Sequence, residues 1–314
     1  MSFRHSHPVS SFSPRPGWLT APLPTLFLTA AILLKLWLVS GQHLTALGDA
    51  GHDDRLFLTL AESILAGQWL GPYNNLTLAK GPLYPLWVAA VSYLGIPLLL
   101  AQHLLYIMAC IIAALALRPL IPAWLPRYVI FLFLLFNPMS FTGSVMAHVV
   151  REGIYPALTL LVIGSAAGFL LRLDRAVTTQ LPWAAGLGLS LAALWLTREE
   201  GVWIVPPLLL LALFGTVKIV RDGRCIPGKL LPLLIPFIIW SVCVTGICIL
   251  NKVYYGIYRT TEIKSPDFLD AYGSLARVNP ARWEPTVPVQ REVRNRIYDV
   301  SPAFSELRPH LEGG

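Results

Sequence analysis

The sequence predicts an all-α polytopic membrane protein with about seven transmembrane helices. Its first outer loop is predicted to hold an amphipathic interfacial helix and a re-entrant helix. Only 13% of the 314 residues are charged, whereas a soluble globular protein averages about 25%. The mean hydropathy is +0.61. Long apolar runs dominate the chain, and in lipid such runs must satisfy their backbone hydrogen bonds internally, which favours helices.

A helix needs about 20 apolar residues to cross about 30 Å of hydrocarbon. The candidate crossings are 21–40, 97–117, 128–147, 154–171, 182–197, 202–217 and 230–250. The runs 182–197 and 202–217 are short and flank the polar string Thr197–Gly201, so we expect them to form a hairpin. The apolar run 82–95 has only 14 residues before a Gly-Ile-Pro turn, a length that suits a re-entrant or interfacial helix.

Charge placement favours a cytoplasmic N-terminus, because Lys and Arg concentrate in cytoplasmic loops. The polar tail 1–17 is not followed by a small-residue cleavage site, so the first apolar run is predicted to remain as a helix. Ten basic residues then lie in inner segments: Arg4, Arg15, Arg118, Arg127, Arg172, Arg175, Lys218, Arg221, Arg224 and Lys229. The short outer loops hold four: Arg55, Lys80, Arg151 and Arg198. If 82–95 crossed the membrane, the later inner clusters would face outward.

This topology divides the chain into three parts. The cytoplasmic tail 1–17 precedes a transmembrane core, 18–250, whose first outer loop is 41–81. The polar, Pro-interrupted segment 251–314 lies outside. Most carboxylates of the core 18–250 fall on the same outer side, namely Asp49, Asp53, Asp54, Glu62, Glu152, Glu199 and Glu200. Because ionisable groups at membrane depth are costly, this gathering indicates a site.

The net charge of +7 does not indicate nucleic-acid binding, because the basic residues are spread over loops rather than gathered in one patch. The four cysteines form no CxxC or Cys/His pattern, and no HExxH spacing occurs. No Walker loop or GxGxxG fingerprint is present either. We therefore expect no metal and no nucleotide cofactor.

Asp53 and Asp54 open the predicted amphipathic helix of the first outer loop. One interpretation is an N-cap with a second acid that complements the helix dipole. The other is a general base held at the membrane surface, with His52 beside it in a supporting role.

Cationic residues follow at three places along the outer side. Lys80 is either an interfacial snorkelling lysine or a partner for a lipid phosphate. The strings Arg151-Glu152 and Arg198-Glu199-Glu200 are either mutually compensating ion pairs or parts of a cavity with a phosphate clamp and a base. Three such turns on one side favour the cavity.

The first outer loop resembles that of GT-C-class membrane glycosyltransferases, in the branch of protein O-mannosyltransferases and the lipid A aminoarabinose transferase. The resemblance rests on Asp53-Asp54-Arg55, on the run from Ala61 to Trp69, and on Lys80-Gly81-Pro82-Leu83-Tyr84. Relatives usually carry Asp-Glu at the acidic pair and Lys-Pro-Pro-Leu at the last element. The later string Leu196-Thr197-Arg198-Glu199-Glu200-Gly201 is similar to a segment of many members.

The resemblance implies an inverting transfer of a sugar from a polyprenyl-phosphate donor to an acceptor hydroxyl of a lipid, glycan or protein. It implies catalytic roles for Asp53, Asp54 and Glu152, phosphate-binding roles for Lys80, Arg151 and Arg198, and support from Glu199 and Glu200. The expected location is a bacterial inner membrane. Relatives are usually longer, so the chain corresponds to a fragment, a minimal core or a degenerate copy. The alternative is a non-catalytic or transport-related membrane protein that handles lipid-linked sugars.

Overall fold

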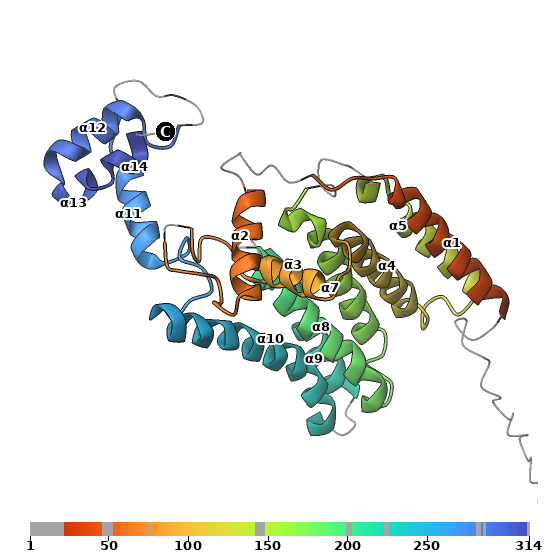
Figure 1. Ribbon diagram of the computed structural model, residues 1–314. Coiled ribbons are helices and arrows are strands. Elements are labelled where there is room, and N and C mark those ends of the chain that lie inside the picture. The colour runs from red at the N-terminus through yellow and green to blue at the C-terminus, as the bar shows by residue number, and fades with distance from the viewer. Residues whose placement is uncertain are drawn as a thin grey trace, which may run out of the picture.

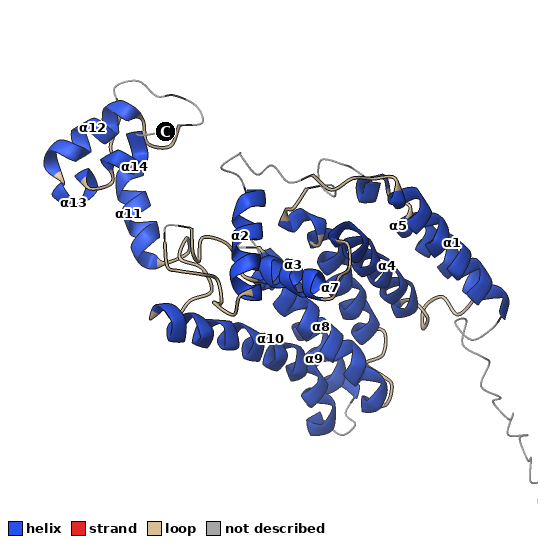
Figure 2. Ribbon diagram, in the orientation of Figure 1, coloured by secondary structure: helices blue, strands red, loops and turns tan. Residues whose placement is uncertain are grey.

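The protein is built from helices, as a computed structural model shows (Figures 1 and 2). The structure describes residues 22–45, 53–74, 76–141, 148–198, 203–222, 226–280, 284 and 287–312. These ranges contain no strand, and their one isolated bridge joins Thr45 to His148 in parallel. The predicted all-α class is therefore confirmed for the described part of the chain.

The long helices of the body are α1 (Pro22–Ser40), α2 (Asp53–Leu65), α3 (Leu83–Tyr93), α4 (Leu98–Ala116), α5 (Trp124–Leu135), α7 (Tyr155–Leu170), α8 (Val177–Thr197), α9 (Val205–Asp222) and α10 (Ile226–Tyr255). Two 3₁₀ turns, η1 (Pro138–Phe141) and η2 (Arg151–Gly153), lie between α5 and α7. The C-terminal helices are α11 (Pro266–Ala276), α12 (Arg291–Val300), α13 (Pro302–Ser305) and α14 (Arg308–Glu312).

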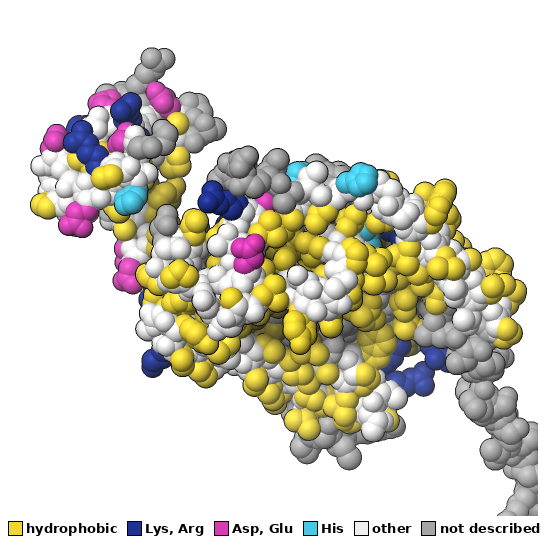
Figure 3. Space-filling model, in the orientation of Figure 1, with side chains coloured by type: hydrophobic (Ala, Val, Ile, Leu, Met, Phe, Trp, Pro, Cys, Tyr) yellow, Lys and Arg dark blue, Asp and Glu magenta, His cyan; other side chains and the backbone are white. Residues whose placement is uncertain are grey.

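Four segments of the described chain are long and apolar enough to cross a membrane: Pro22–Ser40, Leu98–Ala116, Arg151–Leu170 and Leu231–Tyr255. Much of the visible face of the helical body is apolar (Figure 3). Large apolar side chains such as Trp37 (70% exposed) and Phe133 (79% exposed) point outward. An apolar exterior of this kind suits a lipid environment, whereas seven crossings and a re-entrant α3 stay predictions.

The predicted helix 128–147 is wrong as a single element. α5 begins at Trp124 and ends at Leu135, and residues 142–147 lie outside the described residues. The reason is the Asn137-Pro138 pair, because a proline disfavours helical geometry in the residue before it. The Asn137 side chain then accepts a hydrogen bond from the Met139 backbone N–H (3.0 Å), which starts the 3₁₀ turn.

The predicted hairpin of 182–197 and 202–217 also needs correction. α8 begins five residues before the apolar run, because the Gln180 side chain donates to the Leu173 and Arg175 carbonyls and supports a polar first turn. α8 packs most extensively on α10 and α7, and α9 lies against α10 rather than forming a close pair with α8. The apolar run therefore underestimated the length of α8. Adjacency in the chain predicted α9 as its neighbour, whereas α8 packs mainly on α10 and α7.

Helices α4, α7, α8 and α10 pack in sequence to form the centre of the body, and α1 and α5 flank α4. The close α8–α10 contact depends on Gly188, where an added Cβ would lie 2.9 Å from the Pro236 carbonyl oxygen. Small residues at helix contacts allow such close approach in membrane proteins. Outside this centre, α2 packs on α3 through an edge-on contact of the Phe57 and Tyr84 rings (centroids 4.9 Å apart).

The two ends of the bundle differ in charge. At the end where α4 and α7 finish, the Arg172 guanidinium donates to the Leu115 and Ala116 carbonyls (3.1 Å each). Burial lowers the pKa of Arg172, and the nearby charges of Arg118 and Arg175 lower it further. The two described loops that carry Arg118 and Arg172, both predicted to be cytoplasmic, therefore lie at one end. The start of α2 lies at the other end, where Lys80 and Gly81 meet the end of α8.

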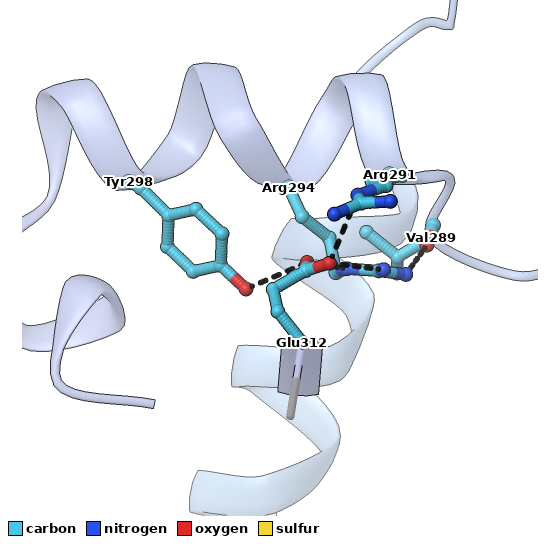
Figure 4. Close-up of polar contacts among 5 residues, drawn as sticks. All are labelled: Val289, Arg291, Arg294, Tyr298 and Glu312. Atoms are coloured by element: carbon cyan, nitrogen blue, oxygen red, sulfur yellow. Dashed lines mark hydrogen bonds and ion pairs between the residues drawn. The ribbon is translucent and has the colours of Figure 1, made fainter. Parts of the chain in front are cut away.

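The C-terminal helices α11–α14 form a small unit that projects from the body beyond α10 (Figure 1). Its apolar core contains Val293, Ile297, Tyr298 and Phe304. Around this core, Glu312 accepts hydrogen bonds from Arg294 (2.7 Å) and Tyr298 (3.2 Å), and it also pairs with Arg291 (Figure 4). The hydrogen bond from Arg294 lowers the pKa of the Glu312 carboxyl.

We expect Gly188→Ala to destabilise the bundle by about 1–3 kcal/mol, because the added methyl group meets backbone atoms that cannot move aside. Thermal unfolding of the detergent-solubilised protein measures this. Gly246→Ala is the matched control, since Gly246 lies inside α10 with nothing within 4 Å of its added Cβ. An equal loss of stability in both variants would contradict close packing at Gly188.

Candidate active site

The acidic pair of the first loop lies at the first turn of α2, as predicted. The Asp53 carboxylate lies 3.7 Å from the Lys80 ammonium, beyond hydrogen-bond distance, and the Asp53 side chain is 40% exposed. Acids in the first turn of a helix are stabilised by its dipole, which explains their place here. Asp53 therefore combines a nearby cation with access to solvent.

Asp54, in contrast, points into the protein and is only 4% exposed. Its carboxylate oxygen lies 3.6 Å from Nδ1 of His148. The backbone bridge between Thr45 and His148 holds this histidine beside the start of the first loop. The two neighbouring aspartates thus have different environments, one open and one enclosed.

Glu152 forms a second acid–cation pair, in addition to that of Asp53 and Lys80. It lies in η2, and its carboxylate is 3.6 Å from a guanidinium nitrogen of Arg198, the residue that ends α8. The Arg198 guanidinium also stacks over the Tyr155 ring, 4.8 Å from its centroid. Two segments about 45 residues apart in sequence therefore meet at this pair.

Gly81 brings the first loop against the end of α8. A Cβ added to Gly81 would lie 2.1 Å from the Leu196 carbonyl oxygen, so only glycine allows this approach. Because Lys80 precedes Gly81 and Arg198 follows this turn of α8, the close contact places both cations at one end of the bundle.

Tyr84 lies in the first turn of α3 and packs against α2 through the Phe57 ring. It is fully buried, and its hydroxyl accepts a hydrogen bond from the Gln102 side chain (3.3 Å). Burial raises the pKa of Tyr84, and the charges of Asp54 and Glu152 raise it further, so both acids lie near this phenol. Gln102 also packs against Gly153, where an added Cβ would meet its amide nitrogen at 2.4 Å. These contacts connect the Asp54 and Glu152 pairs.

Of the remaining predicted site residues, one is buried away from a ligand and three lie outside the described residues. Arg151 is 6% exposed in η2, so little of its surface is open to a ligand. His52, Glu199 and Glu200 lie outside the described residues.

Four further residues belong to the site and were missed from the sequence: Tyr84, Gln102, His148 and Tyr155. Only Tyr84 carried a sequence signal, because it ends the Lys-Gly-Pro-Leu-Tyr string. His148 lies far from the first loop in sequence, and the isolated histidine gave no spacing from which its pairing with Asp54 could be predicted.

In the ranges that the structure describes, no group of three or more His, Cys, Asp or Glu side chains is arranged to hold a metal ion. The chemistry these residues offer is of two kinds. An accessible carboxylate can accept a proton, and nearby cations can stabilise an anion.

No protein family, curated protein or solved structure matches this chain.

We expect Asp54→Ala to reduce the unfolding free energy by about 1–3 kcal/mol, because Asp54 is buried and its removal leaves His148 without the carboxylate. Asp53→Ala is the matched variant in the same helical turn, and loss of its exposed ion pair is expected to cost at most about 1 kcal/mol. Denaturant unfolding in detergent distinguishes the two. A larger effect at Asp53 would contradict the assigned environments.

Proposed function

We propose that the protein is an inverting glycosyltransferase that moves a sugar from a polyprenyl-phosphate donor to an acceptor hydroxyl at the outer membrane face. The observation that carries this proposal is the position of two acid–cation pairs, Asp53–Lys80 and Glu152–Arg198, at one end of an apolar helical bundle, together with the Asp54–His148 pair. A membrane-bound donor and a polar acceptor require a site at such a boundary.

Asp53 is the proposed general base. As the acceptor oxygen bonds to the anomeric carbon, its proton passes to the Asp53 carboxylate, and the bond from that carbon to the phosphate oxygen breaks. Polyprenyl phosphate leaves with the bonding electrons, and the anomeric configuration inverts. Exposure favours Asp53 over Asp54, because an acceptor must reach the base. Asp54 and Glu152 then position neighbouring groups.

Lys80 and Arg198 are the proposed cations for the departing phosphate, whose charge increases in the transition state. Preorganised charges of this kind are often the largest contribution to catalysis. Arg151 is a weaker candidate for direct contact, because it is buried. No step in this scheme requires a metal, since side-chain cations suffice for a single phosphate.

The proposed setting is a bacterial inner membrane with a cytoplasmic N-terminus, seven crossings and α3 re-entrant from the outer side. The partners are the polyprenyl-phosphate-linked sugar, a lipid, glycan or protein acceptor and membrane lipids, and no nucleic acid. The presence of many cations at the end opposite the acidic first loop supports this orientation.

The alternative is a non-catalytic or transport-related protein that handles lipid-linked sugars. The pairing of charges favours this alternative, because Asp53, Asp54 and Glu152 each already have a cation or a histidine beside them. Donor hydrolysis or transfer by purified protein separates the two, since a binding protein retains the donor lipid unchanged.

Asp53→Asn is expected to lower the rate of sugar transfer by about 10²–10⁴-fold, because the amide cannot accept the acceptor proton. Release of polyprenyl phosphate from a panel of polyprenyl-phosphate sugars measures it, with donor-lipid binding as a second readout. Glu62→Gln, an exposed change on the same helix, is the control. Near-normal turnover in Asp53→Asn would exclude this base.

Lys80→Ala is expected to raise the apparent donor KM by about 5- to 10-fold, as one charge-assisted contact is lost. The control is Arg55→Ala, which removes an exposed cation from the same loop. Steady-state kinetics with varied donor measure the effect, and an unchanged donor KM would refute a phosphate role for Lys80.

A further inference from the structure

A small pocket opens beside the candidate active site, between the first loop and the segment that follows α10. Gly81 forms one wall, and the end of α8 forms the second with Trp195, Leu196 and Arg198. The third wall is the turn 260–264, which contributes Thr260, Thr261 and Lys264. The pocket therefore shares Arg198 with the Glu152 pair and borders Lys80 through Gly81.

The turn 260–264 is fixed to the first loop by specific hydrogen bonds. The Glu262 backbone N–H donates to the Leu78 carbonyl (2.9 Å), and the Tyr73 hydroxyl donates to the Glu262 carboxylate (2.8 Å). Before the turn, the Asn251 side chain donates to the Arg259 carbonyl (2.6 Å) and accepts from the Trp69 indole (2.9 Å). These hydrogen bonds hold the turn 260–264 in place as a wall of the pocket beside the candidate active site.

The three cations around the pocket differ in how their charge is balanced. Lys80 lies beside Asp53, and Arg198 lies beside Glu152. Lys264 has no carboxylate within 4.0 Å in the part of the chain that the structure describes, and its ammonium lies 5.7 Å from the Trp195 ring centroid. Lys264 therefore supplies the positive charge that no neighbouring acid offsets.

We infer that this pocket is a subsite for the phosphate group of a polyprenyl phosphate ester, with Lys264 as its principal cation. Thr260 and Thr261 line the pocket, and their hydroxyls are hydrogen-bond donors of the right type for phosphate oxygens. The inference rests on the proposed function for the identity of the lipid, and it deepens that function by assigning phosphate binding to the C-terminal segment.

The charge balance explains why Lys264 rather than Lys80 is the principal ligand. An anion that approaches Lys80 also approaches the Asp53 carboxylate 3.7 Å away, and like charges oppose its binding. Lys264 imposes no such penalty from a neighbouring ion pair. Lys80 and Arg198 then make a smaller contribution to donor binding, and their contribution grows as the leaving phosphate gains charge.

The test is equilibrium binding of farnesyl phosphate to the detergent-solubilised full chain by isothermal titration calorimetry. Inorganic phosphate and farnesol are the comparison probes, because they separate the phosphate from the lipid contribution. Lys264→Gln is expected to weaken farnesyl phosphate binding by about 10-fold, the effect of losing one charged hydrogen-bond donor. Arg277→Gln is the control, an exposed cation of the same segment outside the pocket.

Lys264→Arg keeps the charge and is expected to retain most of the affinity, whereas farnesol binding is expected to be equal in all variants. Equal farnesyl phosphate affinity in wild type and Lys264→Gln overturns the inference, as does an absence of wild-type binding. Tighter binding of inorganic phosphate than of farnesyl phosphate overturns the claim that the bound phosphate belongs to a lipid. Thermal unfolding verifies that each variant is folded.

The outcomes for the subsite and for the proposed function are separable. Lys264-dependent binding in a protein that transfers no sugar supports the subsite and refutes the glycosyltransferase. Sugar transfer by wild type that is unchanged in Lys264→Gln, together with unchanged farnesyl phosphate binding, supports the enzyme and refutes the subsite.

Discussion

The end of the bundle that carries the candidate active site depends on one close approach. There the Gly81 backbone lies against the Leu196 carbonyl at the end of α8. A side chain at position 81 would separate the first loop from α8, and the distance between their cations would grow. The same approach forms a wall of the pocket that Trp195 and Lys264 also line. A steric constraint on one residue thus positions charges from three distant segments.

Charge placement is the second principle of the structure. Acids of the first loop and η2 lie 3.6–3.7 Å from Lys80, Arg198 or His148, which offsets much of the cost of placing them beside an apolar bundle. The pairs differ in exposure, and that difference, more than the residue types, separates an accessible base from a buried positioning group. Lys264 departs from the pairing, and this departure makes it the strongest anion ligand of the pocket.

Helix prediction succeeded where apolar length and polar boundaries agreed, as in α1, α2 and α4. It failed at 128–147, because the run of apolar letters hides the Asn137-Pro138 pair, whose backbone preference ends α5. It also failed for the partner of α8, because adjacency along the chain suggested a hairpin, whereas Gly188 allows α10 to approach more closely. Neither error changes which end of the bundle carries the acids.

The sequence by itself determined the helical class, the start of α2 at Asp53 and the separation of the acidic loop from the Arg172 cluster, because hydropathy and local capping act over a few residues. Only the tertiary structure decided that His148 faces Asp54, that Gln102 bonds to Tyr84 and that the turn 260–264 closes the pocket. These contacts join residues tens to hundreds of positions apart. Their partners are set by how the helices pack, and no local pattern in the chain encodes that.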